Sequence, residues 1–249
     1  MIQLTLEQIV SLKNWFLPDW PGPLVGLHII HTGYGHGWAD RWPNPRALLV
    51  ETAHNYSFAG DPAALTSTGL KGLISGFVEA PEPFVPLLQE TFPDAYEWGR
   101  VMFELPAQPD FSWPDDFLVR RLQAADSGHL EGLSQETGWI SKTWGGPAGL
   151  AASGMAWGAF AGARLVSVAC SFLVGERYED IGVVTEAEYR GLGLSQACAG
   201  ALCQDIIQRG RRPSWTTSLD NAASRRVAEK LGFTFHRHDR LFLVGIDVP

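Results

Sequence analysis

Long apolar runs and blocks of positive charge are both missing from this sequence of 249 residues. No segment reaches about 18 consecutive apolar residues, the length that a membrane-spanning helix needs. No run of five lysines and arginines occurs, and the formal net charge is -8, so no phosphate-neutralising surface for DNA or RNA is evident. We therefore expect no membrane span and no nucleic-acid partner.

Cysteine is also scarce. Cys170, Cys198 and Cys203 are the three cysteines, and they include no Cys-x-x-Cys pair and are too few to frame a disulfide scaffold. Cys198 and Cys203 lie five positions apart and so do not share a helix face; we expect one of them in the core and neither as a nucleophile. Residues 1–13 have neither the basic start nor the apolar run of a signal peptide, so we expect a soluble protein of the reducing cytoplasm.

What the sequence does contain is enough apolar material for a packed core. Hydrophobic residues make up 45% and charged residues 18%, which is ordinary for a globular protein. Thirteen of the 16 prolines fall between Pro18 and Pro114, and the stretch from Pro106 to Pro114 has the composition of a linker. We therefore predict an N-terminal α+β domain over residues 1–114 and a second domain over residues 115–249.

The elements of the first part are indistinct. Residues 4–16 carry apolar side chains at helical spacing, and Thr5 is a suitable N-cap, which predicts an amphipathic helix. Residues 24–30 and 47–50 are short apolar runs between Gly and Pro, which favours strands. Residues 83–90 fit a short helix.

Helices and strands alternate clearly in the second part. We predict strands at 117–122, 155–160, 164–173, 180–185 and 215–219, helices at 124–133, 192–209 and 221–231, and a closing pair of strands at 233–235 and 241–246. The helix over 192–209 has the best-formed pattern, and Gly210 ends it. The expected fold is therefore α/β (α+β), a mixed sheet flanked by helices.

The most informative segment is residues 181–195, where a strand runs through a short turn into a helix. Gly191 and Gly193 let main-chain N–H groups approach a ligand, and the helix N-terminus favours an anion such as a pyrophosphate. Arg190 and Ser195 add further donors. Gln196 stands where a dinucleotide-binding loop has its third glycine, and no Gly-Lys-Ser/Thr occurs, so neither a Rossmann site nor a Walker loop is indicated.

Several motifs together resemble one family. Tyr189-Arg-Gly-Leu-Gly-Leu194, Asn221-x-x-Ser224 and Glu229-Lys-Leu-Gly-Phe233 resemble the GNAT superfamily of acyl-CoA N-acyltransferases over about residues 117–246. With Thr185 and Pro213-x-Trp215, the spacing is similar to the branch of zwittermicin-resistance-type acetyltransferases. The resemblance implies the GNAT fold, a mixed and mostly antiparallel sheet flanked by helices. It also raises the hypothesis that the N-terminal part is a degenerate copy of that fold, without the glycine loop.

The resemblance implies acetyl-CoA as the acyl donor. The residues that it assigns to the cofactor are Val183, Val184, Thr185, Arg190, Gly191, Leu192, Gly193, Leu194, Ser195, Asn221 and Ser224. In this family the strand before the glycine loop is splayed from its neighbour at a bulge, so that the pantetheine arm bonds along an open edge.

Two catalytic roles remain to be filled. Many relatives have a tyrosine before the Glu-Lys-x-Gly-Phe stretch that protonates the leaving thiolate, but this chain has Ala228, so Ser224 or a water would donate instead. The attacking amine must lose a proton, and Asp180 is favoured slightly over Glu179 as the base. The alternative is that both acids lie at a solvated strand end.

The leading hypothesis is an N-acetyltransferase that moves an acetyl group from acetyl-CoA to a small primary amine by direct attack in a ternary complex. A non-catalytic acyl-CoA-binding or regulatory module is the alternative, and a protein-interaction role of the N-terminal part is a third. No metal site is expected, because the histidines of residues 28–54 lack a metal-binding spacing. The sequence does not indicate an oligomeric state.

Overall fold

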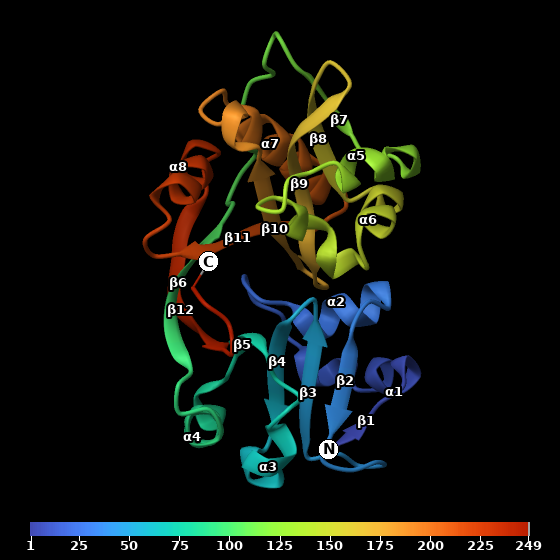
Figure 1. Ribbon diagram of the computed structural model, residues 1–249, viewed down its shortest axis with the longest axis vertical. Coiled ribbons are helices and arrows are strands. Elements are labelled where there is room, and N and C mark those ends of the chain that lie inside the picture. The colour runs from blue at the N-terminus through green and yellow to red at the C-terminus, as the bar shows by residue number, and fades with distance from the viewer. Residues whose placement is uncertain (249) are drawn as a thin grey trace.

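A computed structural model describes residues 1–248, and one 12-stranded sheet runs through the whole of this part of the chain. Its strands, in sheet order, are β1 (Ile2–Gln3), β2 (His36–Ala39), β3 (Ala47–Thr52), β4 (Asn55–Gly60), β5 (Gly76–Glu79), β12 (Thr234–Val244), β6 (Tyr96–Glu104), β11 (Arg212–Ser218), β10 (Tyr178–Thr185), β9 (Arg164–Val174), β8 (Ala156–Ala161) and β7 (Leu118–Arg121). Figure 1 shows two lobes, with β6 and β12 as long strands that run from one to the other. The mixed sheet with flanking helices confirms the predicted fold class.

Helices cover both faces of the sheet. They are α1 (Leu6–Ser11), α2 (Val25–Thr32), α3 (Ser67–Leu70), α4 (Val85–Thr91), α5 (Ser127–Glu131), α6 (Pro147–Ser153), α7 (Leu194–Gln208) and α8 (Ala222–Lys230), with a 3-10 helix η5 at Gly138–Trp144. In the C-terminal lobe, α7 and α8 share one apolar core with the sheet, and α5, η5 and α6 share another. Ala169 and Val168, neighbours on β9, belong to these two different cores, so the two helix groups cover opposite faces.

The two lobes repeat one strand arrangement. Strands β2, β3 and β4 form an antiparallel meander, and β5 then pairs parallel to β4. In the C-terminal lobe β8, β9 and β10 form the meander, and β11 pairs parallel to β10. Each lobe is completed by a strand from the other part of the chain, since β12 pairs with β5 and β6 pairs with β11. The predicted division at residue 114 stays a prediction, and the sheet crosses it.

Much of the predicted element order is confirmed. Thr5 caps α1 in a capping box, and β3 and α4 lie where they were predicted. The β8–β9 hairpin, β10, α7, β11 and α8 also match within a few residues. Gly210 has φ +77 just beyond α7, as a helix-ending glycine requires.

The predicted strand at residues 24–30 is wrong, because this segment forms helix α2. Val25, Gly26, Leu27, His28 and Ile29 are all buried, since α2 packs against both β3 and β9. A helix buried all round has no polar face, so its short apolar run looks like a strand.

Three further predictions need correction. The helix over 4–16 is interrupted at Leu12, after which a short 3-10 helix, η1 (Lys13–Phe16), follows. The closing pair at 233–235 and 241–246 is one strand, β12, because its polar middle pairs with β6 instead of forming a loop. The sequence reasoning also missed β6, whose buried run from Val101 to Phe103 is short and follows exposed or half-buried residues.

Candidate active site

The turn at the head of α7 is open and shaped for an anion. Gly191 and Gly193 have φ angles of +80° and +78°. This is the left-handed region, which residues with a Cβ rarely adopt. A Cβ built at either glycine would meet no atom within 4 Å, so neighbouring side chains do not fill the turn. Gly193 is the N-cap of a 15-residue helix, whose first N–H groups have no helical partner. The turn therefore has the uncrowded backbone and the free N–H groups that an anion site at a helix N-terminus needs.

Arg190 lies beside this turn, with its charge at the surface. Its Nη2 donates to Glu136 Oε1 at 2.6 Å and its Nε to the Thr185 carbonyl at 3.3 Å. The two charged side chains are 54% and 64% exposed, and a pair of that kind contributes about 1 kcal/mol or less. An anion at the turn can therefore compete with Glu136 for the guanidinium.

The strands below the turn part from one another. Parallel pairing of β10 with β11 covers three positions, from Tyr178–Arg212 to Asp180–Ser214, although β10 continues to Thr185. On its other side β10 pairs with β9 throughout, with a register shift between Asp180 and Ile181. In the part of the chain that the structure describes, the facing edges beyond Asp180 thus keep free main-chain donors and acceptors. Val183, Val184 and Thr185 lie along this opening.

Asp180 lies at the closed end of the opening. Its side chain is buried, and its Oδ1 accepts hydrogen bonds from Ser214 Oγ and Thr216 Oγ1, both at 2.9 Å. Burial raises the pKa of this carboxyl to about 7, against the opposing effect of these hydrogen bonds and of Arg100 and Arg237. A carboxyl with that pKa exchanges a proton readily near neutral pH.

Two arginines that the sequence reasoning missed lie on the same sheet face as Asp180. Val101 and Phe103 of β6 pack in the α7–α8 core, so Arg100 between Gly99 and Val101 points to the opposite face. Arg100 stacks on Trp98 at 4.3 Å, and its Nε is buried without a partner. Burial lowers the pKa of this guanidinium to about 10. The alternation of β6 was the signal that could have identified it.

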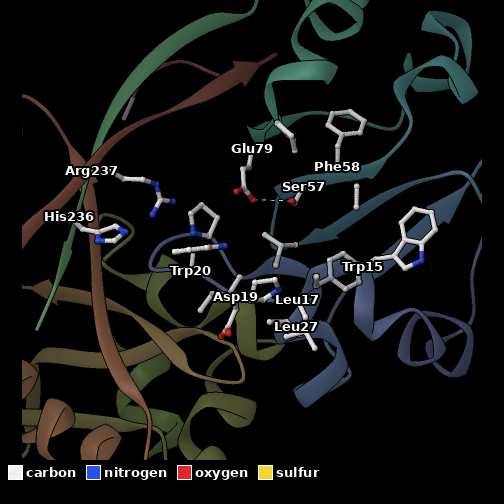
Figure 2. Close-up of a pocket in the computed structure, with 18 residues that line it drawn as sticks. Trp15, Leu17, Asp19, Trp20, Leu27, Ser57, Phe58, Glu79, His236 and Arg237 are labelled. Carbon is white, nitrogen blue, oxygen red and sulfur yellow. Dashed lines mark hydrogen bonds between the residues drawn. The ribbon is translucent and has the colours of Figure 1, made fainter. Parts of the chain in front are cut away.

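Arg237 of β12 is the second of these arginines. Its Nη1 donates to the Pro21 carbonyl at 2.6 Å and its Nη2 to Asp239 at 3.0 Å. Figure 2 shows its guanidinium reaching toward the segment that carries Asp19 and Trp20. Arg237 therefore ties the N-terminal segment to the C-terminal lobe.

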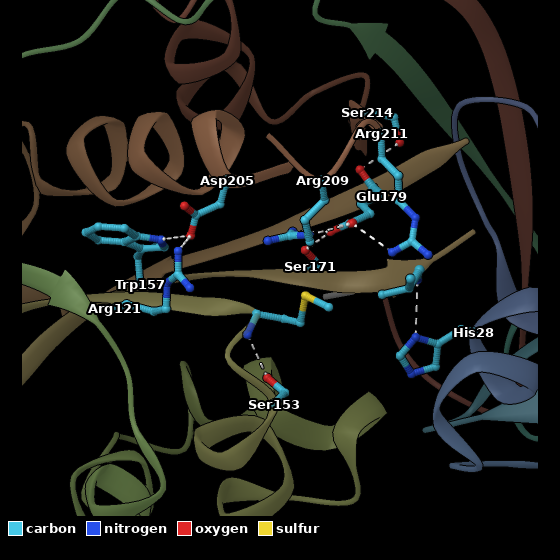
Figure 3. Close-up of polar contacts among 12 residues, drawn as sticks. His28, Arg121, Ser153, Trp157, Ser171, Glu179, Asp205, Arg209, Arg211 and Ser214 are labelled. Atoms are coloured by element: carbon cyan, nitrogen blue, oxygen red, sulfur yellow. Dashed lines mark hydrogen bonds and ion pairs between the residues drawn. The ribbon is translucent and has the colours of Figure 1, made fainter. Parts of the chain in front are cut away.

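Glu179, the second acid considered as base, has a structural environment. It is fully buried and accepts hydrogen bonds from Arg209 Nη2 at 2.7 Å, from Arg211 Nη1 at 3.2 Å and from Ser171 (Figure 3). Burial alone would raise its pKa, but the Arg209 hydrogen bond and charge outweigh it and hold the pKa below its usual value. This carboxylate joins β10 to the end of α7, and its ion pairs leave it less available for proton transfer than Asp180.

Asn221 and Ser224 lie at the start of α8, and each already has a partner. Asn221 Oδ1 accepts from the Ser224 N–H at 3.0 Å and caps the helix. Ser224 Oγ accepts from Trp215 Nε1 at 2.9 Å. Ala228 is fully buried in the α7–α8 core, so no hydroxyl is supplied from this position.

The loop residues Leu192 and Leu194 differ in their surroundings. Leu192 is exposed beside the turn, whereas Leu194 is buried in the α7–α8 core and anchors the first turn of α7. Ser195 is half-buried in that first turn. Leu194 thus anchors the turn to the α7–α8 core, while the side of the turn that carries Leu192 faces solvent.

The cysteine prediction needs one correction. Cys198 and Cys203 are both fully buried in the core, not one of them, because α7 is covered on nearly every side. Burial raises the pKa of the Cys198 thiol to about 12, which does not suit a nucleophile. Residues 1–248 contain no group of three or more metal-ligating side chains that could hold an ion, and none of their helices has the length and hydropathy of a membrane span.

Comparison with known proteins agrees with this geometry. Residues 19–242 match the family model described as GNAT acetyltransferase. The chain is 38% identical over 213 residues to a Streptomyces virginiae protein named as an uncharacterized N-acetyltransferase in the mutA 5' region, with 84% of this chain and 90% of that protein covered.

Solved structures share the fold. A GCN5-related N-acetyltransferase-like protein from Streptococcus suis superposes with a TM-score of 0.74 at 19% identity, covering 97% of this chain and 100% of that one. A tandem GNAT protein from the clavulanic acid biosynthesis pathway has a TM-score of 0.61 at 11% identity, covering 100% of this chain and 99% of that one. With the match of the family model over most of its length, the chain belongs to the GNAT acetyltransferase family and is an acyltransferase.

Proposed function

We propose that the protein transfers an acetyl group from acetyl-CoA to a small primary amine by direct attack in a ternary complex. The observation that carries this proposal is a continuous arrangement of three features. An open glycine turn heads α7, the unpaired edges of β10 and β11 lead away from it, and Asp180 lies where these strands meet.

The residues present fit acetyl-CoA. Main-chain N–H groups of residues 191–195 and the Arg190 guanidinium would hold the diphosphate, and the edge at Val183, Val184 and Thr185 would hold the pantetheine arm. When bound, acetyl-CoA supplies a thioester whose carbonyl carbon accepts the amine. Asn221 and Ser224 flank the opposite strand, at the end of β11.

Asp180 would take the proton of the amine. The Asp180 carboxylate would accept the amine proton as the new N–C bond forms, and the sulfur would leave as the C–S bond breaks. Ser214 and Thr216 orient the accepting oxygen in advance, since both donate to Oδ1. The thiolate is a good leaving group by itself, so Ser224 or water suffices as a donor at a site where Ala228 replaces the tyrosine of many relatives.

The test is thiol release from acetyl-CoA by the full-length protein with a panel of small primary amines, followed by mass detection of the N-acetyl product. Turnover on at least one amine, lost in Gly193→Asp, supports the proposal. Tight CoA binding with no product on any amine would favour the non-catalytic acyl-CoA-binding module instead. No CoA binding at all would overturn the assignment of the turn.

A further inference from the structure

The N-terminal lobe repeats the parting of parallel strands seen in the C-terminal lobe. Strands β4 and β5 pair at three positions, from Asn55–Phe77 to Ser57–Glu79, although β4 continues to Gly60. At the last pair, Ser57 Oγ donates to Glu79 Oε2 at 2.9 Å. The last pair of β10 and β11 also joins a serine and a carboxylate, with Ser214 Oγ donating to Asp180 Oδ1 at 2.9 Å, but here the carboxylate lies on the first strand and the serine on the second. Both lobes thus place a serine-bonded carboxylate where two strands diverge.

A cavity of about 560 Å3 adjoins this point in the N-terminal lobe. It is bounded by β4, β5, the segment over residues 15–27 and His236 and Arg237 of β12. Its volume falls within the range of about 300–1,000 Å3 that is typical of small-molecule sites. Figure 2 shows the Glu79 carboxylate directed into the space between β4 and the segment that carries Trp20. Neither Asp180 nor the glycine turn lines this cavity.

Glu79 has no ion-pair partner in this wall. Among the described residues, no Lys, Arg or His nitrogen pairs with Glu79, and Arg237 is bound to Asp239 and to the Pro21 carbonyl. Burial raises the pKa of Glu79 to about 7, against the hydrogen bond from Ser57; the nearby charge of Asp239 adds to this rise, and that of Arg237 opposes it. A carboxylate of this kind gains most from a cation supplied by a ligand.

Apart from Asp19, His236 and Arg237, the remaining wall is aromatic and apolar. Trp15, Trp20 and Phe58 line the cavity, together with Leu17 and Leu27. Aromatic faces attract ammonium groups and offer rigid apolar area. The connection between β4 and β5 holds only η2 (Pro62–Ala64) and the four-residue α3, without a glycine turn at the head of a long helix. Acetyl-CoA is therefore not the expected occupant.

We propose that this cavity is a second ligand site, which binds an organic ammonium ion with an apolar body. The ammonium group lies on Glu79 and Ser57, and the body lies against the aromatic wall. The site rests on its own geometry and does not depend on the proposed acetyl transfer.

Titration calorimetry on the full-length protein tests the site. The probe is 2-phenylethylammonium, compared with the anion 3-phenylpropionate and the neutral 3-phenyl-1-propanol, in the Asp180→Asn background so that binding at the transfer site is weakened. We expect the ammonium to bind at least tenfold more tightly than either analogue. Its affinity should rise about tenfold from pH 6 to pH 8, as Glu79 ionises.

Glu79→Gln in the same background keeps the shape and the hydrogen bond from Ser57 but removes the charge, and we expect at least a tenfold loss of affinity. Glu79→Asp should retain part of it. Equal affinity in Glu79→Gln, or equal binding of the anion, would overturn the proposal. If Glu79→Gln fails to fold, Trp20→Ala is read instead, because that side chain is 62% exposed; unchanged binding there would also count against the site.

Discussion

The two lobes pair their strands alike but connect the parallel strands differently. In the C-terminal lobe the connection from β10 to β11 carries Gly191, Gly193 and the 15-residue α7. In the N-terminal lobe the connection from β4 to β5 carries one short 3-10 helix and the four-residue α3. The parallel strands therefore separate in both lobes whatever connects them. An anion-binding turn, in contrast, requires a glycine turn that leads into a long helix.

Neither lobe is complete without the other. Strand β6 precedes residue 114 yet pairs with both β11 and β12, and β12 closes the N-terminal lobe beside β5. A fragment that begins at residue 117 lacks the strand between β11 and β12. The hypothesis that the N-terminal part is an interaction domain must therefore be tested with the whole chain.

The sharpest test of the comparison exchanges a glycine in each connection for aspartate. Gly193→Asp should weaken CoA binding by about 100-fold or more, because it adds a negative charge and a strained backbone at the glycine turn. Gly72→Asp is the matched control, since Gly72 has φ +86, open surroundings and a place in the other connection. Calorimetric affinities for CoA give the answer, and equal losses in both variants would show that strain alone is responsible.

Replacing Asp180, the carboxylate where β10 and β11 separate, should lower turnover. Asp180→Asn is expected to lower kcat by about 10²- to 10⁴-fold, the usual contribution of a general base. In the unchanged protein, kcat/KM should rise with pH through about 7, since the ionised form of Asp180 accepts the proton. Steady-state rates from pH 5.5 to 9 check both, with Asp94→Asn, an exposed carboxylate, as control. A flat profile would exclude Asp180 as the base.

The same substitution has an opposite effect on stability. The folded pKa of Asp180 lies above the ordinary 3.8, so ionising this carboxyl costs stability as the pH rises from about 4 to 7. Asp180→Asn should therefore have a higher Tm than the unchanged protein at pH 8 and a smaller difference at pH 4. Thermal unfolding at the two pH values measures it; a lower Tm at pH 8 would contradict the expectation.

His28 provides a way to loosen the contact between the lobes. Its Nε2 donates to the Thr143 carbonyl at 2.8 Å and its Nδ1 accepts from the Val174 N–H at 3.2 Å, so the neutral ring satisfies both partners. Burial lowers its pKa from 6.5 to about 4. The unfolded chain therefore binds the proton first, and about 2–3 kcal/mol of stability should be lost as the pH falls from 6.5 to 4. Urea unfolding of His28→Gln should show a weaker dependence over that window.

Arg100 should influence the pKa of Asp180 through its charge. Its charge helps hold the pKa of Asp180 down against burial, so Arg100→Met should move the pH–rate midpoint upward by less than about one unit. Arg41→Met, at an exposed arginine of the N-terminal lobe, is the control. A downward shift would show that Arg100 does not act through its charge.

The smallest expected effect concerns the exposed ion pair between Arg190 and Glu136, beside the glycine turn. Glu136→Gln removes the partner of Arg190 and should tighten CoA binding by about two- to fivefold, in line with the small energy of exposed ion pairs. The difference should shrink at high salt. Weaker binding in this variant would mean that Glu136 positions Arg190 instead of competing for it.

Sequence patterns predicted the C-terminal lobe better than the N-terminal one. The β8–β9 hairpin and α7 follow strong local periodicities that tertiary contacts do not override. Helix α2 was missed because it is buried between the lobes, and β6 was missed because its buried run from Val101 to Phe103 is short and follows polar, exposed or half-buried residues. The hydropathy pattern of a segment predicts which of its side chains are buried. It does not predict which helix or strand packs against them.

The order of residues alone determined the glycine turn before α7. Gly191 and Gly193 precede the long helix α7, and the conformations that only glycine adopts freely are set by local chemistry. Only the tertiary structure distinguishes the surroundings of the two adjacent acids, Glu179 and Asp180. Alternation sends Glu179 to Arg209 and Arg211 and sends Asp180 to two hydroxyl groups on the other face. Burial and partners set the pKa of a carboxyl, and both come from elements far away in the chain.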